Sequence, residues 1–325
     1  MTPAFFDGTG LGWAGSLCRM TNYSRDLTEH RMRNRLSTWI TEDDFKQISE
    51  LGFNTVRIPV GYWNVIDDPY GRFSPSDVTE SLRVIDWAFS EADKNHLSVL
   101  LDMHGGPGSQ NGIDHSGCSM DPQWTTPANI ELSLAAVKAM AKRYSSRSNL
   151  LGIELLNEPS LAIETNSHDI LLDYYEKSYA IIRKYSNTAL VVFNELYADY
   201  YGSWSGVLQE PAYYNVAVDW HLYDWQEPYT SRNASQHVQD ALAWAETIQK
   251  YTHIHPILVG EWTMSTGIVV QAGQPFVDAC LQSFATTLGS YAWNWKLQRG
   301  IGFDEWDVQL QSQLPDGLNI IPPPL

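Results

Sequence analysis

Continuously apolar segments alternate with helical patterns along most of the chain, and this alternation narrows the possible folds more than any other feature. The helical segments carry apolar residues at three- and four-residue spacing. Strands that are apolar on both faces and alternate with helices indicate a parallel sheet covered on both sides. We therefore expect an α/β fold.

The alternation can be followed segment by segment from residue 41. The first helix, over 41–52, is well marked because Thr41 supplies an N-cap and Gly52 a stop. Further helices are expected over 80–95, 129–144, 168–185, 235–251 and 275–287. Strands are expected over 54–60, 97–104, 150–158, 189–197, 216–223, 256–262 and 290–297. An imperfect first strand near Gly8–Gly15 brings the count to eight, which predicts a (β/α)8 barrel.

The length of 325 residues is one that such barrels use as a single domain. No linker, internal repeat or low-complexity segment interrupts the pattern. We expect one domain over 1–325, with a proline-rich tail at about 316–325. The longest apolar runs are too short for a membrane-spanning helix, so no transmembrane segment is expected.

The formal net charge of −17 argues against nucleic acid and anionic membranes as partners, because binding to phosphate groups needs clustered Lys and Arg. It is compatible with a neutral substrate and with an extracellular enzyme. The start, MTPAFFDGTG, lacks the basic and apolar regions of a secretory signal. Asn-X-Ser acceptors at Asn22 and Asn233 fit secretion, which is the expectation. The oligomeric state is left open, with a monomer favoured.

Three cysteines show no CxxC spacing, so a structural zinc or a thioredoxin-like site is not expected. Cys280 lies in an apolar helical pattern and is expected to be buried. Cys18 and Cys118 lie in expected loops. Whether these two form a disulfide is left open.

Chemically capable side chains end most of the predicted strands. In barrels of this kind the catalytic residues lie at the carboxyl ends of the strands, where they meet at one mouth. The residues at these ends are Arg57, His104, Asn157, Glu158, His221, Tyr223, Glu261, Trp293 and Trp295. One such residue is commonly only a solvated or ion-paired group, but six strand ends together indicate a site.

Two glutamates, Glu158 and Glu261, are the carboxylate pair that glycoside hydrolysis requires. One protonates the leaving oxygen and the other attacks the anomeric carbon. Asn157 can hold the 2-hydroxyl of the sugar. Arg57 near a carboxylate would keep it ionised, as a nucleophile must be, and Tyr223 can bind that same carboxylate.

Thirteen tryptophans are many for this length, and they favour either a sugar-binding cleft or simple core filling. The indole of Trp295 can form the floor of the site, against which the sugar ring packs. Glu154 lies too far along its strand to partner Glu158, so it is expected to be a structural or ion-pairing group.

Six stretches carry a resemblance to a known family: GFNTVRIPVGYW, LLDMHGGPGSQNGIDHSG, GIELLNEP, DWHLY, VGEW and AWNWK, spread between residues 52 and 296. They resemble glycoside hydrolase family 5, in the clan of barrel enzymes whose catalytic glutamates end strands four and seven. The resemblance implies acid/base catalysis by Glu158, a nucleophile at Glu261 and retention of the β configuration. It also implies active-site roles for Arg57, His104, Asn157, His221, Tyr223 and Trp295.

Within the family, HGGPGSQNGIDHSG and RIPVGYW are most similar to the fungal-type exo-β-1,3-glucanase branch. That branch usually reads GGWLVLEPW early in the chain, with a glutamate that holds the terminal glucose, whereas this chain reads GLGWAGSLCRM. It tends to have an aromatic residue and an asparagine where this chain has Ile113 and His115. His115 is therefore a candidate substrate-binding residue, and Trp225 another that can replace the aromatic clamp at the cleft entrance. These departures bear on linkage and on exo action.

The sequence thus predicts a retaining β-glycosidase that hydrolyses β-linked glucans or glucosides by double displacement, with β-1,3-glucan as the leading substrate. An endo-acting β-1,4- or β-1,6-glucanase stays open, as does a β-glucosidase acting on glycolipids or steryl glucosides. A non-catalytic carbohydrate-binding barrel is disfavoured because both glutamates and their expected supports are present.

Neither a cofactor nor a metal is expected. GLGWAG (10–15) matches the dinucleotide-binding pattern GxGxxG, but no apolar strand precedes it, and SLCRMTNYS after it is a poor helix former. HGGPGSQNG lacks the GK[ST] ending of a phosphate loop. No HExxH or His/carboxylate cluster indicates a catalytic metal.

Overall fold

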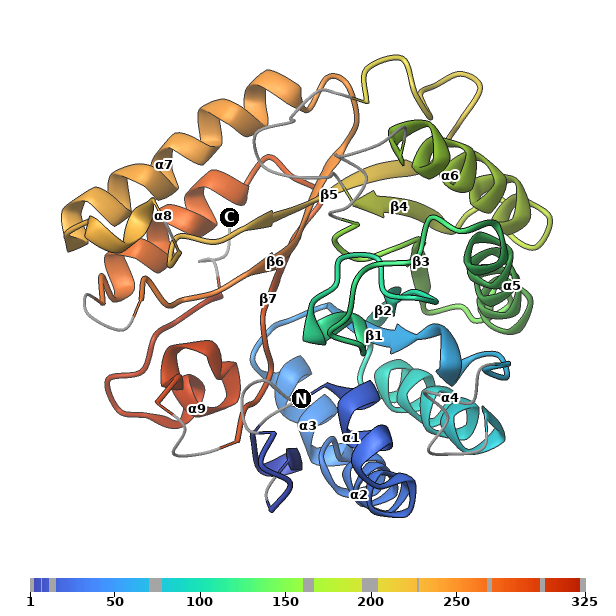
Figure 1. Cartoon of the computed structure of the whole chain (residues 1–325). Helices are drawn as coiled ribbons and strands as arrows, with labels where there is room; N and C mark the ends of the chain where they lie inside the picture. The colour runs from blue at the N-terminus through green and yellow to red at the C-terminus, as the bar shows by residue number, and fades with distance from the viewer. Residues whose placement is uncertain are drawn as a thin grey trace. The chain divides into compact units, whose positions relative to one another are not determined.

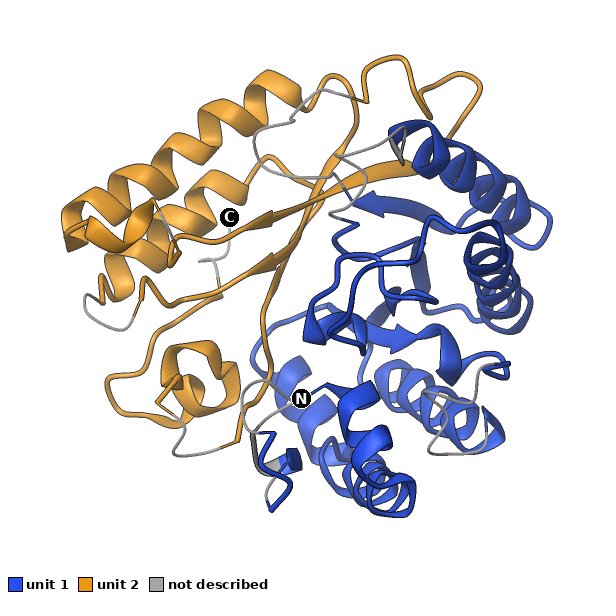
Figure 2. Cartoon of the chain, in the orientation of Figure 1, with its two compact units in different colours: residues 1–197 blue, residues 198–325 orange. Residues whose placement is uncertain are grey.

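The computed structural model describes residues 3–6, 8–11, 16–69, 78–159, 167–194, 204–226, 228–267, 271–298 and 302–321. Two compact units divide the chain (Figure 2): an N-terminal unit, Met1–Tyr197, and a C-terminal unit, Ala198–Leu325. The expectation of a single domain over 1–325 stays a prediction.

The N-terminal unit contains four strands that pair in parallel and in chain order. They are β1 (Thr55–Gly61), β2 (Ser98–Gly105), β3 (Leu150–Glu154) and β4 (Leu190–Asn194). A helix precedes each strand: α3 (Glu42–Glu50), α4 (Val78–Lys94), α5 (Pro127–Tyr144) and α6 (Ser167–Arg183). Helices α4, α5 and α6 lie along the outer side of the strands (Figure 1). Strand β2 is buried from Val99 to Gly105, as a strand covered on both faces must be.

Helix α3 forms where its capping residues predict. Thr41 and Asp44 make a reciprocal capping box at its start. Gly52 follows its end with φ +95°, a left-handed conformation that glycine adopts readily and other residues rarely.

The C-terminal unit continues the alternation. Strands β5 (Val216–Leu222), β6 (Ile257–Trp262) and β7 (Ser290–Ala292) pair in parallel. Helices α7 (Ala234–Tyr251) and α8 (Gln274–Phe284) follow β5 and β6, and they lie side by side (Figure 1). A 3-10 helix (Asp304–Trp306) and a short helix α9 (Val308–Gln313) come after β7. Cys280 of α8 is fully buried, as expected.

Two predicted strands are shorter in the structure. β3 ends at Glu154 rather than at residue 158, because the backbone N–H of Leu155 bonds to Val192 of β4 while that of Asn157 bonds to Met103 of β2. The ladder therefore becomes irregular just before the candidate residues. β7 ends at residue 292 instead of 297. β4 ends at Asn194, and residues 195–197 of the predicted strand lie outside the described part.

The N-terminal segment departs most from expectation. In place of the first strand predicted near Gly8–Gly15, residues 8–10 form a turn, and 12–15 lie outside the described residues. The segment judged a poor helix former contains helix α1 (Leu17–Tyr23), and α2 (Arg25–Thr38) follows it. Ser16 caps α1 and Ser24 caps α2, each accepting a backbone N–H at 3.3–3.4 Å. Each of the two helices therefore begins at a serine cap.

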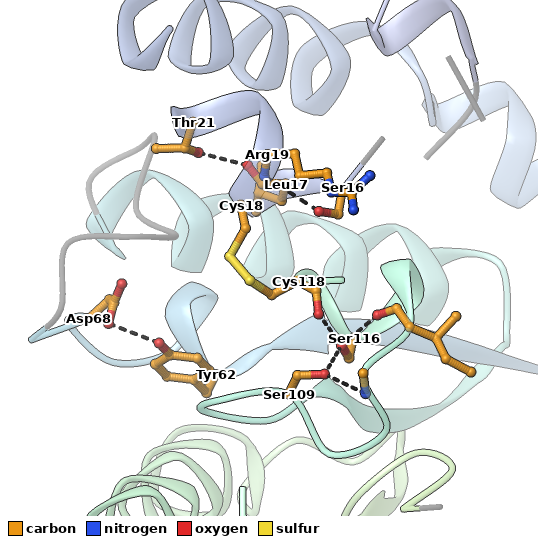
Figure 3. The surroundings of a disulfide bond; sticks show 12 residues. Ser16, Leu17, Cys18, Arg19, Thr21, Tyr62, Asp68, Ser109, Ser116 and Cys118 are labelled. Carbon is orange, nitrogen blue, oxygen red and sulfur yellow. Dashed lines mark hydrogen bonds between the residues drawn. A yellow bond between two sulfur atoms is a disulfide. The ribbon is translucent and has the colours of Figure 1, made fainter. Parts of the chain in front are cut away.

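A disulfide joins Cys18 of α1 to Cys118 in the loop after β2, with the two Cα atoms 5.0 Å apart (Figure 3). Cys18 therefore lies in a helix rather than in the expected loop. The backbone N–H of Cys18 also donates to the carbonyl of Gly117 at 3.0 Å. In the same loop Ser109 and Ser116 share a 2.6 Å hydroxyl bond, and Ser109 accepts the N–H of Gly112. These bonds tie the loop over residues 105–118 to α1 and to itself.

Near the end of the chain, Asn319 and Gln274 exchange two hydrogen bonds of 2.8 Å. The start of the predicted tail is therefore bound to the first turn of α8, and residues 322–325 lie outside the described part. Among the described helices, none combines the length and the apolar character needed to cross a membrane.

Candidate active site

Arg57 of β1 is the centre of a buried polar cluster in the N-terminal unit. Its Nε and Nη2 donate to the two carboxylate oxygens of Glu154 at 2.7 and 2.8 Å, and Nη2 also lies 3.1 Å from Asp102. Asp102 and Glu154 are register partners in β2 and β3, so both carboxylates point to the same face. All three side chains are at most 3% exposed. Glu154 is thus the ion-pairing group that the sequence predicted.

The position of His104, a predicted site residue, is determined by a residue that sequence reasoning missed. Nδ1 of His104 lies 2.8 Å from Oδ2 of Asp102, which has no exposed surface. Residues two apart on a strand share a face. The signal was present as the pattern Asp-X-His, which occurs on two strands.

Asn157, just beyond β3, is held by both its side chain and its backbone. Its Oδ1 accepts a 2.8 Å bond from Arg57, and its carbonyl accepts one from Gln110 at 2.9 Å. The side chain is fully buried, yet its Nδ2 has no hydrogen-bond partner among the described residues. A buried donor without an acceptor costs about 1–3 kcal/mol, so this group is suited to a ligand oxygen.

Glu158 adopts a left-handed backbone conformation, with φ +43°. That conformation is uncommon outside glycine, and such strain gathers at functional sites. It turns the chain away from the direction of β3 before Pro159. The carboxylate is about a third exposed, and its Oε2 lies 3.5 Å from Nδ1 of His115. The carbonyl of Glu158 accepts a 3.2 Å bond from Asn111.

Glu261, near the end of β6, is the centre of the corresponding group in the C-terminal unit. The hydroxyl of Tyr223 donates to its Oε2 at 2.7 Å, and Nδ1 of His221 lies 3.7 Å from the same oxygen. Asp219 in turn contacts Nε2 of His221 at 3.1 Å, repeating the Asp-X-His arrangement of β2. Glu261 is only 5% exposed. Sequence reasoning missed Asp219 as well.

Gly260 is required here by close approach rather than by an unusual φ. A Cβ at this position would lie 2.1 Å from Oδ2 of Asp219. The N–H of Gly260 instead donates to Oδ1 of that carboxylate at 2.5 Å. The register between β5 and β6 shifts at this point, so that His221 stands opposite Glu261. Gly260 therefore allows the close approach of the two strands that places His221 next to Glu261.

Asp224 follows Tyr223 but points to the other side, toward helix α7. Its Oδ2 lies 2.9 Å from Nδ1 of His237, and both residues are 1% exposed. Burial raises the pKa of Asp224 to about 6, while the bond to His237 acts in the opposite direction. This buried pair anchors the segment that carries Tyr223 and Trp225.

Trp225 lines a cavity within the C-terminal unit. Its wall consists of Trp225, Ser265, Gly267, Gln271, Gly302, Phe303, Glu305 and Trp306, around about 140 Å³. Trp306 meets Trp225 edge-on, with ring centroids 5.2 Å apart, and stacks on Tyr223 at 5.6 Å. Since Tyr223 binds Glu261, the cavity begins one aromatic ring away from that carboxylate. Trp306 and Glu305 were not predicted.

Trp295 follows β7 and is held through its backbone. Its carbonyl accepts a 2.8 Å bond from the N–H of Gln309 in α9. Its side chain is partly exposed. A role as the floor of the sugar site stays a prediction.

The ten residues assigned a catalytic or substrate-binding role are divided evenly between the units. Arg57, His104, His115, Asn157 and Glu158 lie in the N-terminal unit, and His221, Tyr223, Trp225, Glu261 and Trp295 in the C-terminal unit. Within each unit a candidate catalytic glutamate contacts a histidine from the predicted set. His115 contacts Glu158, and its expected binding to substrate stays a prediction.

Comparison with solved structures shows the fold class. A rutinosidase from Aspergillus niger superposes with a TM-score of 0.79 over 96% of this chain and 92% of its own, at 20% identity. The chain has the (β/α)8 TIM-barrel fold that its alternating pattern predicted, and its described residues contain seven of the strands.

Two curated relatives are similar in sequence. A glucan 1,3-beta-glucosidase from Blumeria graminis is 34% identical over 275 residues, which cover 81% of this chain but 61% of the relative. A glucan 1,3-beta-glucosidase from Pichia angusta is 29% identical over 93% of this chain and 77% of its own length. The chain thus spans only about three-fifths of the first of these relatives.

The family model described as Cellulase (glycosyl hydrolase family 5) matches residues 20–298. That range contains every one of the ten predicted site residues, and both candidate glutamates among them. The chain therefore belongs to glycosyl hydrolase family 5.

Proposed function

We propose that this chain is a retaining β-glycosidase acting on β-linked glucan, with β-1,3-linked glucose as the leading substrate. The observation that carries the proposal is Glu261, buried at the end of a strand and bound by Tyr223 at 2.7 Å. The linkage is supported by the relatives named glucan 1,3-beta-glucosidase.

Glu261 is the proposed nucleophile. A carboxylate attacks best when it is ionised and held in one orientation, and a donor hydroxyl supports both. In the first step an oxygen of Glu261 forms a bond to the anomeric carbon as the bond from that carbon to the leaving oxygen breaks. The Tyr223 hydroxyl stays on Oε2 through this step and holds the carboxylate in its orientation.

Glu158 is the proposed acid/base. It gives its proton to the leaving oxygen in the first step, and in the second it takes one from the water that hydrolyses the glycosyl ester. Its partial exposure suits a group that must reach both the leaving group and water.

Asn157 is proposed to hold the sugar's 2-hydroxyl through its buried Nδ2 donor. Arg57 binds the oxygen of the same amide, so the nitrogen is the end that faces a ligand. Hydrogen bonds to the 2-hydroxyl strengthen as positive charge develops on the sugar ring. His104 and His221, each supported by a buried aspartate, are proposed to bind further hydroxyls.

The cavity beside Trp225 is proposed to bind a second glucosyl residue. Indole faces suit the apolar faces of a glucose ring, and Glu305, Gln271 and Ser265 supply hydrogen-bonding groups for its hydroxyls. Glu305 gives this wall a carboxylate that can bind glucose. The segment GLGWAGSLCRM lacks the early glutamate that has this role in the exo-β-1,3-glucanase branch.

We propose that the protein functions outside the cytosol. The Cys18–Cys118 disulfide supports this, because such bonds persist in oxidising compartments. A monomer is proposed as the working form.

Two measurements test the proposed function. A 2-deoxy-2-fluoro-β-glucoside with a good leaving group should inactivate the enzyme, and peptide mass spectrometry should find the label on Glu261. Product analysis on laminarin, cellulose oligomers, gentiobiose and aryl β-glucosides should show the fastest turnover on laminarin, with glucose as the product of exo action. A label on another residue refutes the nucleophile, and preferred cleavage of cellulose oligomers or gentiobiose refutes the linkage.

A further inference from the structure

We propose that His115 is a positioning residue for the acid/base Glu158, held as a neutral ring by Asn111. This inference rests on the proposed function of Glu158 and adds two residues to it. Asn111 has no role in the mechanism proposed above. His115 was expected only to contact substrate.

The orientation of the Asn111 amide is determined by two backbone groups. Its Oδ1 accepts the N–H of Ile113 at 3.0 Å, and its Nδ2 donates to the carbonyl of Glu158 at 3.2 Å. Exchanging the amide oxygen and nitrogen would place donor against donor and acceptor against acceptor. The Asn111 nitrogen is therefore the end that lies 2.9 Å from Nε2 of His115.

That contact determines the form of the imidazole. An amide N–H₂ can only donate, so Nε2 of His115 must accept, and the ring proton lies on Nδ1. Nδ1 faces Oε2 of Glu158 at 3.5 Å. Protonating Nε2 would point its N–H at the amide hydrogens of Asn111. The arrangement thus favours a neutral ring whose Nδ1–H faces Glu158.

A neutral donor matches what a general acid/base needs. A positive ring beside Glu158 would favour the ionised carboxylate and oppose its role as an acid. A neutral N–H beside Oε2 stabilises the carboxylate that forms when Glu158 gives up its proton. His115 thereby orients the carboxyl group of Glu158 in both half-reactions.

The surroundings hold His115 in this place. Its ring meets the ring of His104 edge-on, with centroids 5.7 Å apart. The 3-10 helix that carries it, Asp114–Ser116, lies in the loop closed by the Cys18–Cys118 disulfide and the Ser109–Ser116 bond. Because the disulfide and the hydrogen bond restrain this loop, the His115 side chain keeps its orientation when substrate binds.

The experiment uses leaving groups that differ in their need for a proton. Dinitrophenolate leaves without protonation, whereas the glucose released from laminaribiose must be protonated by Glu158. The variant His115→Phe keeps the ring but removes the donor. His115→Asn places an amide N–H where Nδ1 stood. His30→Phe, at an exposed residue of α2, is the matched control.

For His115→Phe we expect kcat/KM on laminaribiose to fall about 10- to 100-fold, and kcat/KM on dinitrophenyl β-glucoside to change less than about 3-fold. His115→Asn should recover most of the loss, and His30→Phe should match the wild type. Equal losses on the two substrates, or no recovery with asparagine, would overturn the proposal. Failure of the proposed function is distinct, since the wild type would then cleave neither glucoside. Activity on the dinitrophenyl substrate also reports that each variant is folded.

Discussion

The hydroxyl of Tyr223 donates a 2.7 Å hydrogen bond to Oε2 of Glu261, although the two residues come from different strands. A hydrogen bond to a charged group contributes about 1.5–3 kcal/mol. For Tyr223→Phe we expect kcat to fall about 10- to 100-fold with little change in thermal stability. Steady-state kinetics on aryl β-glucosides measures the effect. Tyr185→Phe, at an exposed tyrosine, should have no effect. Unchanged kcat in Tyr223→Phe would remove Tyr223 from the mechanism.

The contact between Asn157 and the 2-hydroxyl can be tested by combining a variant of the protein with a substrate that lacks this hydroxyl. Asn157→Ala should slow hydrolysis of an aryl β-glucoside about 10- to 100-fold, because a bond to the 2-hydroxyl strengthens in the transition state. The same variant should hydrolyse the 2-deoxyglucoside at nearly the wild-type rate. If the two losses multiply instead of overlapping, Asn157 does not contact that hydroxyl.

The cavity at Trp225 predicts a dependence on chain length. Glu305→Gln and Trp225→Ala should each lower kcat/KM for laminaritriose about 10-fold. Both should leave 4-nitrophenyl β-glucoside nearly unaffected, since it fills one sugar site. The measurement is the ratio of kcat/KM for laminaritriose to kcat/KM for 4-nitrophenyl β-glucoside. Leu242→Ala, at an exposed residue, is the control and should leave this ratio unchanged. A parallel loss on both substrates would show that the cavity shapes the catalytic centre rather than a second subsite.

Asp224 predicts a dependence of stability on pH. Its folded-state pKa of about 6 lies above the ordinary value of about 3.8 for aspartate, so the folded state binds the proton more tightly. The contribution of Asp224 to the free energy of unfolding is therefore fully present at low pH. It decreases by at most about 3 kcal/mol as the pH rises from about 4 to about 6. In Asp224→Asn this loss is absent. Thermal unfolding of both proteins at several pH values should show the variant gaining on the wild type across that range, and a constant difference would contradict the assignment.

The disulfide predicts a loss of stability on reduction. It closes a separation of 100 residues, and removing such a bond costs about 2–4 kcal/mol. The double variant Cys18→Ser with Cys118→Ser should unfold at lower denaturant than the wild type. Reductant should lower the wild-type midpoint and leave the variant unchanged. Identical midpoints with and without reductant in the wild type would contradict the prediction.

Sequence periodicity predicts most of the fold because most helices and strands carry the apolar spacing typical of their type, and some helices also have clear capping residues. Helix α3 begins after Thr41 and ends before Gly52, as its residues indicate. The irregular parts are harder. α1 begins at the cap Ser16, in a segment of weak helix propensity. β3 ends early because the N–H groups of Leu155 and Asn157 bond to different strands.

For the site, a residue's place on a strand is predictable, but its partner is not. Both glutamates stand where the motifs place them, whereas Arg57 is engaged by Glu154 and Asp102 in the structure. Those contacts depend on strand register. Strands that are buried on both faces are continuously apolar, so their sequences carry no alternation that would mark the register. The contact between His115 and Glu158 was not predicted, because it depends on how the loop after β2 folds.

The bond between Cys18 and Cys118 also makes the first part of the chain a covalent ring. Arg57, His104 and His115 all lie inside it. A protease that cuts once anywhere between the two cysteines would leave both fragments joined. On a denaturing gel, nicked protein would then run as one species until a thiol reagent is added.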